Sequence, residues 1–156
     1  MSRTTTSPSP PTAPWSSFLA DAPALAAAVR ARFEANLHHV LGTLRPDGSP
    51  RLSGTEVQFE GGQVTVGMMS GSRKLSDVRT DPRVELHSAP LEEDLTEGDA
   101  KLSGHLVEIA RTEPVDEGAG FFRVELALVS LVRVAADELV LQTWRPARGV
   151  SETRRR

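Results

Sequence analysis

The 156-residue sequence contains no cysteine, and this absence limits its chemistry. Without thiols the chain cannot form disulfide bonds, thiolate metal sites or a cysteine nucleophile. The chain also lacks an apolar run of membrane-spanning length, and its N-terminus lacks the charged-then-apolar pattern of a signal peptide. We therefore expect no membrane association, and a cytoplasmic protein.

The sequence has no surplus of basic residues. Its formal net charge is −3 and its isoelectric point is near 5.8. A domain that neutralises the phosphates of a duplex normally carries a basic surplus, so we expect no nucleic-acid partner. Small anionic ligands remain compatible with this charge.

Residue patterns typical of metal or nucleophilic sites are also missing. His38 and His39 are neighbours that would face opposite sides of a strand, while His87 and His105 stand alone. Neither a zinc site nor a Ser-His pair follows from this spacing, and packing or surface roles are expected for the histidines. The acidic stretch 91–99 lacks the alternating carboxylates of a calcium loop, so we expect a solvated loop and no metal.

The pattern of apolar residues predicts one folded domain at residues 17–148. Residues 1–16 are rich in Ser, Thr and Pro, and we predict disordered tails at 1–16 and 149–156. Asp21 can cap a helix and Pro23 suits its first turn. Apolar residues then recur every four positions, at Leu25, Val29, Phe33 and Leu37, and the helix is expected to run through about residue 36. An amphipathic helix packed on the domain is therefore expected.

The rest of the domain is predicted to be mainly β. Six or seven strands are expected, at residues 39–44, 51–60, 63–69, 84–88, 100–109, 121–134 and 139–144. A Pro-Asp-Gly turn lies in residues 45–50, and Gly61-Gly62 is typical of a two-residue hairpin. No crossover helix of useful length separates the strands, so a small antiparallel barrel is predicted.

A strand, a turn of small residues and a short helix follow one another at residues 63–80. The helix is expected at 73–80, ended by a proline at 82. Its start would combine unpaired N–H groups and a positive dipole end with a hydroxyl of Ser70 or Ser72 and the charges of Arg73 and Lys74. Such a set suits a phosphate monoester. The alternative is an ordinary capped surface helix with solvated cations.

This segment resembles a known family. Gly71-Ser72-Arg73-Lys74 followed by Asp81-Pro82-Arg83-Val84, after two hairpin strands that begin at Arg51, is similar to the FMN-binding split-barrel proteins related to pyridoxamine 5'-phosphate oxidase. The similarity covers about residues 33–148 and implies a small antiparallel split β-barrel with an N-terminal helix and a short helix after the third strand.

The resemblance also implies a set of cofactor-binding residues. In the family, Arg73 and Lys74 would bind the flavin phosphate, Arg51 would reach the phosphate region, and Gly67 and Met68 would line the isoalloxazine ring. Trp144 and Arg148 would come from a partner subunit. The complete predicted set is Arg51, Leu52, Ser53, Gly67, Met68, Ser70, Ser72, Arg73, Lys74, Trp144 and Arg148.

Two departures from the family pattern bear on the activity. The oxidase has a lysine after its second-strand arginine, whereas residues 51–56 read Arg-Leu-Ser-Gly-Thr-Glu. The oxidase also carries a C-terminal Arg-Leu-His-Asp-Arg segment that holds the vitamin, which is absent here. Vitamin B6 oxidase activity is therefore not expected, and the small-molecule substrate stays unidentified.

The resemblance predicts an FMN-dependent oxidoreductase. A flavin supplies the hydride or electron chemistry, so no protein acid or base is demanded and no catalytic residue is predicted. Two alternatives remain open. One is a reductase that uses a deazaflavin, coenzyme F-420. The other is a non-catalytic flavin- or haem-binding protein, for which His87 or His105 would be the axial ligand.

We further predict a homodimer. The apolar residues of the strand at 121–134 exceed what one sheet face can bury, namely Phe121, Phe122, Val124, Leu126, Leu128, Val129, Leu131 and Val132. The resemblance implies that the partner's Trp144 closes the flavin pocket. The alternative is that Trp144 fills the core of its own barrel.

Overall fold

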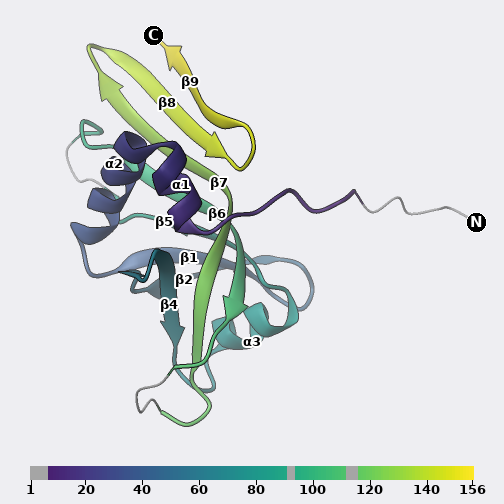
Figure 1. Cartoon of the computed structure of the whole chain (residues 1–156). Helices are drawn as coiled ribbons and strands as arrows, with labels where there is room; N and C mark the ends of the chain where they lie inside the picture. Colours follow the sequence, from purple (N-terminus) through teal and green to yellow (C-terminus); the bar gives the residue numbers. More distant parts are fainter. Residues whose placement is uncertain (1–6, 91–93, 112–115) are drawn as a thin grey trace, which may run out of the picture.

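The computed structural model describes residues 7–90, 94–111 and 116–156. These residues form three helices and nine strands (Figure 1). The elements are α1 (Trp15–Asp21), α2 (Pro23–Glu34), β1 (His39–Leu44), β2 (Pro50–Thr55), β3 (Gln58–Glu60), β4 (Gln63–Met68), α3 (Arg73–Thr80), β5 (Arg83–His87), β6 (Asp99–Glu108), β7 (Gly120–Ala135), β8 (Glu138–Arg145) and β9 (Gly149–Arg155). The predicted mainly-β class is confirmed, with more strands than expected.

The strands form one antiparallel sheet centred on β7. The order is β2-β1-β5-β6-β7-β4-β3, and β8 and β9 continue from the upper half of β7. One edge of β7 pairs with β6. The other edge pairs first with β4 at Gly120 to Arg123, then with Ala13 at Leu126, and then with β8 from Val129 onward. In Figure 1, β7 accordingly runs through most of the height of the molecule.

The barrel closes through the stretch predicted as one strand at residues 51–60. The structure breaks it at Glu56 and Val57 into β2, which pairs with β1, and β3, which pairs with β4. Both ends of the seven-strand path therefore belong to one short chain segment, and β2 also approaches β4. The prediction of a single strand was wrong, because a strand that reaches both partners must change direction between them.

The predicted turns are confirmed. Gly61 and Gly62 have φ of 56° and 74°, the left-handed conformation that a two-residue hairpin needs. Gly48 has φ of 84° and its N–H donates to the Arg45 carbonyl, which closes the Pro-Asp-Gly turn.

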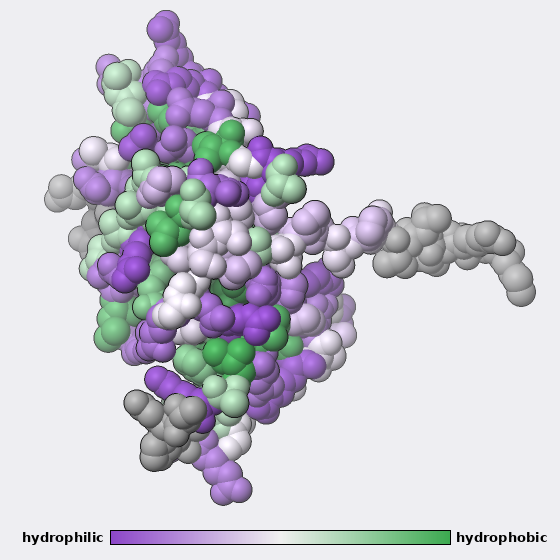
Figure 2. Space-filling model, in the orientation of Figure 1, coloured by the Kyte–Doolittle hydropathy of each residue, from purple (hydrophilic) through white to green (hydrophobic). Residues whose placement is uncertain are grey.

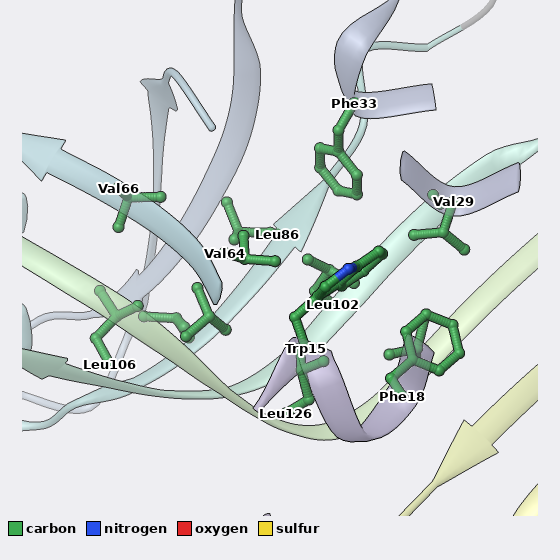
Figure 3. Close-up of a cluster of buried hydrophobic side chains, with 14 of the residues drawn as sticks. Trp15, Phe18, Val29, Phe33, Val64, Val66, Leu86, Leu102, Leu106 and Leu126 are labelled. Atoms are coloured by element: carbon green, nitrogen blue, oxygen red, sulfur yellow. The ribbon is translucent and has the colours of Figure 1, made fainter. Parts of the chain in front are cut away.

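Helices α1 and α2 cover one face of the sheet and contribute Trp15, Phe18 and Phe33 to the core (Figure 3). Leu25, Val29 and Phe33 of α2 are buried as predicted, whereas Leu37 follows the helix and is 65% exposed. Asp21 does not cap α2, because it ends α1, a helix that the sequence analysis missed. In the described parts of the chain, no helix combines the length and apolar character needed to cross a membrane.

A β-bulge in β7 changes which residues face the core. The register between β6 and β7 shifts at Ser103 and Gly104, which leaves Ala127 as the extra residue. Before the bulge Phe122, Val124 and Leu126 are buried, and after it Val129 and Leu131 are. Because both sets turn inward, five of the eight apolar residues counted above are buried within one chain. The excess used to predict a dimer is therefore smaller than the sequence suggests.

Both predicted tails need correction. Ala13 exchanges two backbone hydrogen bonds with Leu126, of 2.9 and 2.8 Å, and Trp15 is buried in the core, so order begins before residue 17. Residues 149–155 form β9, paired along its whole length with β8. Exposed polar residues can form such an edge strand because the pairing uses backbone groups, and hydrophobic patterning does not reveal it. Residues 1–6 of the predicted N-terminal tail lie outside the described residues.

The bulge gives a stability prediction at Gly104. A Cβ atom there would lie 1.8 Å from the Glu125 carbonyl oxygen, so the two strands would have to separate. Gly104→Ala should lower the free energy of unfolding by about 1–3 kcal/mol, the usual cost of forcing an atom into packed structure. The matched control is Gly54→Ala, because a Cβ at Gly54 meets nothing within 4 Å. Urea unfolding of both variants checks this, and equal stabilities would contradict the bulge geometry.

Candidate functional site

The site is built around the start of α3. Gly71, with φ of 74°, reverses the chain after β4, and Ser72 occupies the N-cap position with extended backbone angles. The helix then runs from Arg73 to Thr80, as predicted. Its free N–H groups and positive dipole end therefore lie directly beyond the end of β4.

A buried carboxylate fixes this helix to the sheet. Asp77 of α3 is 3% exposed, and its Oδ2 accepts hydrogen bonds of 2.7 Å from both Thr43 Oγ1 of β1 and Arg51 Nε of β2. Burial alone would raise the pKa of Asp77. The hydrogen bonds from Arg51 and Thr43 outweigh that effect and hold its pKa below the ordinary value of 3.8. Asp77 is therefore an anion that joins α3 to two strands.

Lys74 lies against the end of β2. Its Nζ donates a 2.7 Å hydrogen bond to the Gly54 carbonyl oxygen. Burial lowers the pKa of Lys74 below its usual 10.5. A cation that is partly withdrawn from water and held by one carbonyl has N–H donors left for an anion.

A cavity of about 460 Å³ opens beside Lys74. It is lined by the end of β2, the end of β4 and the start of α3, and we refer to it as the β2–α3 cavity. Its lining residues are His38, Gly54, Thr55, Glu56, Gln58, Gly67, Met69, Ser72, Lys74 and Arg111. Ser72 Oγ is buried here and has no hydrogen-bond partner among the described residues. A buried hydroxyl without a partner is costly, so a ligand that hydrogen-bonds with Ser72 would be stabilising.

A second cavity of about 350 Å³ adjoins the first one. It lies between β4 and β7, and its lining residues are Gly67, Met68, Met69, Arg111, Asp116, Ala119, Gly120 and Phe121. The two cavities share Gly67, Met69 and Arg111. Together they form one groove that leads from the start of α3 across the end of β4 to Phe121.

Arg111 is a residue of this groove that sequence reasoning missed. Its guanidinium carbon lies 4.5 Å from the centre of the Phe121 ring, a cation–π contact. No local pattern marks Arg111, because it follows β6 and reaches the groove only through the pairing of β6, β7 and β4.

The structure brings together some of the predicted residues and separates others. Gly67, Ser72 and Lys74 line the β2–α3 cavity, and Met68 lines the second cavity although only 3% exposed. Four other predicted residues do not line the groove. Ser70 and Arg73 are exposed near the start of α3, and Arg51 and Ser53 lie in β2 outside the cavity lining.

Two residues of β2 need closer attention. Arg51 is bound to Asp77, so its Nε holds α3 in place and is not offered to a ligand. Leu52 points to the opposite face of the sheet, where it is 76% exposed and lines a different cavity. Leu52 does not line the groove of its own chain, and its predicted cofactor contact stays a prediction.

Trp144 does not occupy the predicted position. It is fully buried, its ring centre lies 5.0 Å from that of Phe18, and its Nε1–H donates a 3.2 Å hydrogen bond to Asp21 Oδ2. The prediction that it covers a partner's flavin was wrong, and the alternative that it fills its own core is correct. Arg148 lies in the turn between β8 and β9, where it lines another cavity with Pro10 and Ala127. Its role towards a partner subunit stays a prediction.

The histidines have the structural roles expected of them, with one exception. His39 is buried and its Nδ1 accepts the Ala89 N–H at 3.0 Å, so Nε2 carries the proton that it donates to the Phe33 carbonyl at 2.7 Å. Burial lowers the pKa of His39, consistent with a neutral ring. The exception is His38, which lines the β2–α3 cavity. His87 and His105 each line another cavity, away from the groove.

Comparison with known proteins supports the fold. No model of a protein family and no curated protein matches the sequence. Among solved structures, a pyridoxamine 5'-phosphate oxidase-related, FMN-binding protein from Nostoc punctiforme is similar, with 14% identity over 92% of this chain and 97% of that chain and a TM-score of 0.64.

Two further structures share this fold. PhzG from Burkholderia lata, solved with tetrahydrophenazine-1-carboxylic acid, is 15% identical over 85% of this chain and 88% of that chain, with a TM-score of 0.62. A haem-binding protein from Mycobacterium smegmatis is 16% identical over 82% and 87%, with a TM-score of 0.53. The neighbours thus differ in what they bind, and at these identities they establish the architecture alone.

The contacts of Asp77 lead to a pH prediction. At neutral pH, Asp77→Asn should lower the free energy of unfolding by roughly 1–3 kcal/mol, because hydrogen bonds between charged groups are lost. The pKa of Asp77 is lower in the folded state, so its stabilisation is complete above the unfolded-state value of 3.8 and is lost as pH falls through the folded value. Urea unfolding over a pH series should show the two proteins converge below that value. A constant difference at all pH values would contradict the charged pair.

Proposed function

We propose that this protein, which has the split-barrel fold of flavin- and deazaflavin-binding oxidoreductases, binds FMN in its groove and transfers a hydride or electrons to a small molecule. The observation that carries the proposal is the convergence of Lys74, the buried Ser72 hydroxyl and the α3 N-terminus on one end of a cavity.

The phosphate would be held at the α3 end of the groove. A phosphate monoester accepts hydrogen bonds from N–H and O–H groups and carries negative charge, and this end supplies both donors and charge. Lys74 Nζ and the Ser72 hydroxyl would be two donors, and Arg73 adds a second cation at the same helix start. The residues present therefore fit the phosphate.

The ring system would lie along the end of β4. Gly67 and Met69 belong to both cavities, so a planar group can extend between them without meeting a bulky wall at Gly67. Cavities of about 460 and 350 Å³ fall in the usual size range of cofactor sites. FMN when bound supplies the redox chemistry, and this chain's residues bind it, orient it and set the charge around it.

Coenzyme F-420 is an alternative occupant of the same groove, and no feature of the described residues favours it over FMN. Haem is less well supported. The two histidines predicted as axial ligands, His87 and His105, line cavities outside the groove. The lining of those cavities does not include the start of α3, which suits a phosphate. We therefore retain FMN as the cofactor and an oxidoreductase as the class.

We also propose that the working unit is a homodimer. The sheet face opposite α1 and α2 carries a cavity of about 520 Å³ with Leu52 at its edge, lined in addition by Val40, Gly42, Glu85, His87, Pro90 and Lys101. Leu52 is 76% exposed, more than any other large apolar side chain among the described residues. The face seen in Figure 2 carries hydrophobic patches interspersed with hydrophilic side chains. A second copy placed on the Leu52 face would cover it.

The phosphate contacts are tested by the double variant Arg73→Ala/Lys74→Ala. Its FMN binding free energy should become less favourable by about 2–5 kcal/mol, because the charge-assisted contact of Lys74 and the nearby charge of Arg73 are lost. Titration of flavin fluorescence measures this. Riboflavin, which lacks the phosphate, should bind wild type and variant equally poorly. Arg79→Ala is the matched control, since Arg79 lies in the last turn of α3 and pairs with Glu108 at 2.7 Å. FMN affinity unchanged in the double variant, with an unchanged circular dichroism spectrum, would refute the proposed site.

The dimer is tested by sedimentation at graded protein concentration, with and without FMN. Wild type should dimerise, and FMN should raise the dimer population if the partner helps to close the groove. Leu52→Asp should shift the protein to monomer, whereas Leu37→Asp, at another exposed leucine, should not. A wild-type monomer at all concentrations, with concentration-independent FMN affinity, would contradict the proposal.

A further inference from the structure

We propose that the cavity between β4 and β7 binds a planar, mainly apolar molecule that carries one carboxylate, and that Arg111 binds this carboxylate. The inference rests on the proposed function in one respect, since the ligand would then lie beside the cofactor and be its reaction partner.

The walls of this cavity are mostly apolar. Met68, Met69 and Phe121 provide thioether and aromatic surface, and the remaining small residues leave the space open. Methionine side chains adapt to a ligand's shape and make favourable contacts with aromatic rings. A volume of about 350 Å³ is within the usual range of small-molecule sites. These walls favour a flat, apolar molecule.

Arg111 adds a positive charge at the edge of this apolar space. The Phe121 ring lies 4.5 Å from the guanidinium carbon and limits the positions that the group can take. The N–H groups of guanidinium lie in its own plane, so contact with a ring face leaves them available. A planar fork of donors matches a carboxylate, which it can bind through two parallel hydrogen bonds.

Gly67 is not required by the fold at the place where the two cavities meet. Its φ is not in the left-handed region, and a Cβ atom would make only an ordinary 3.8 Å contact with Phe121. Any larger side chain would instead stand in the space shared by both cavities. The glycine therefore keeps the second cavity in contact with the cofactor end of the groove, as a reaction partner would need.

Asp116 limits the charge of the ligand. Asp116 lines the same cavity as Arg111, and its negative charge disfavours a ligand with two negative charges. A molecule with one carboxylate can meet Arg111 and keep its apolar part towards the rest of the wall. This charge arrangement favours a monocarboxylate over a phosphate or a dicarboxylate.

The test uses 2-naphthoate and its neutral counterpart 2-naphthamide as probes. Calorimetric titration of the FMN-loaded full-length protein should show naphthoate binding at least about tenfold more tightly than naphthamide, which reflects one charge-assisted contact. Arg111→Gln should lower naphthoate affinity roughly tenfold to a hundredfold and leave naphthamide affinity unchanged. Arg111→Lys should keep only part of the naphthoate affinity, because an ammonium group lacks the planar set of N–H donors of a guanidinium. Arg79→Gln is the matched control, and it should bind both probes as wild type does.

Cofactor affinity is measured separately by flavin fluorescence, which distinguishes the two proposals. Arg111 also lines the β2–α3 cavity, so Arg111→Gln should weaken FMN binding, by a factor well below the roughly tenfold to hundredfold loss of naphthoate affinity. The inference is overturned if neither probe binds, if both bind equally, or if Arg111→Gln weakens FMN as much as naphthoate, since Arg111 would then belong to the cofactor site. If the chain fails to bind FMN but still discriminates the probes through Arg111, the inference stands and the proposed function fails.

Discussion

The backbone pairing of β7 is the constraint on which the rest of the structure depends. This continuous 16-residue strand pairs with β6 along one edge. Along the other edge it pairs in turn with β4, Ala13 and β8. A strand of that length cannot stay flat, and the bulge opposite Gly104 provides the bend and resets which side chains face inward. The barrel, the β8–β9 hairpin and the groove all take their positions from this one strand.

The groove lies at one end of that arrangement, where β4 pairs with the first residues of β7. Asp77 then connects the sheet to α3, because its carboxylate accepts from Thr43 and Arg51 on two different strands. Asp77 is buried and Arg51 is partly buried, so removing Arg51 would leave the carboxylate charge uncompensated. A polar contact in the body of the fold thus positions the helix start that faces the ligand, although it need not touch the ligand itself.

What the sequence could predict depended on how locally each feature is encoded. The turn and helix at residues 70–80, and the hairpin at Gly61 and Gly62, use glycine conformations and caps that neighbouring residues specify, and these predictions are confirmed. The resemblance assigned Arg51 to the phosphate region, and the local sequence does not reveal its structural partner Asp77, which lies 26 residues away. The resemblance assigned Trp144 to a partner subunit, and the local sequence does not reveal its hydrogen-bond acceptor Asp21, which lies 123 residues away. Arg111 gave no signal at all, since only the sheet pairing brings it to the groove.

The edge strand β9 and helix α1 were missed for a different reason. Each has short or polar sequence that satisfies its backbone hydrogen bonds without a regular apolar pattern. The bulge in β7 was equally invisible, and it changed the interpretation of eight apolar residues from an exposed surface into a largely buried core. The fold class was therefore predictable, while the surfaces available to a partner were not.

The central claim is that the groove beside α3 holds a flavin phosphate. The most direct measurement is the visible spectrum of protein purified from its own host, together with the mass of the cofactor released on denaturation. The account predicts a yellow protein that releases FMN in a stoichiometric amount. A Soret band, or a protein that releases no phosphate-bearing flavin or deazaflavin, would contradict it.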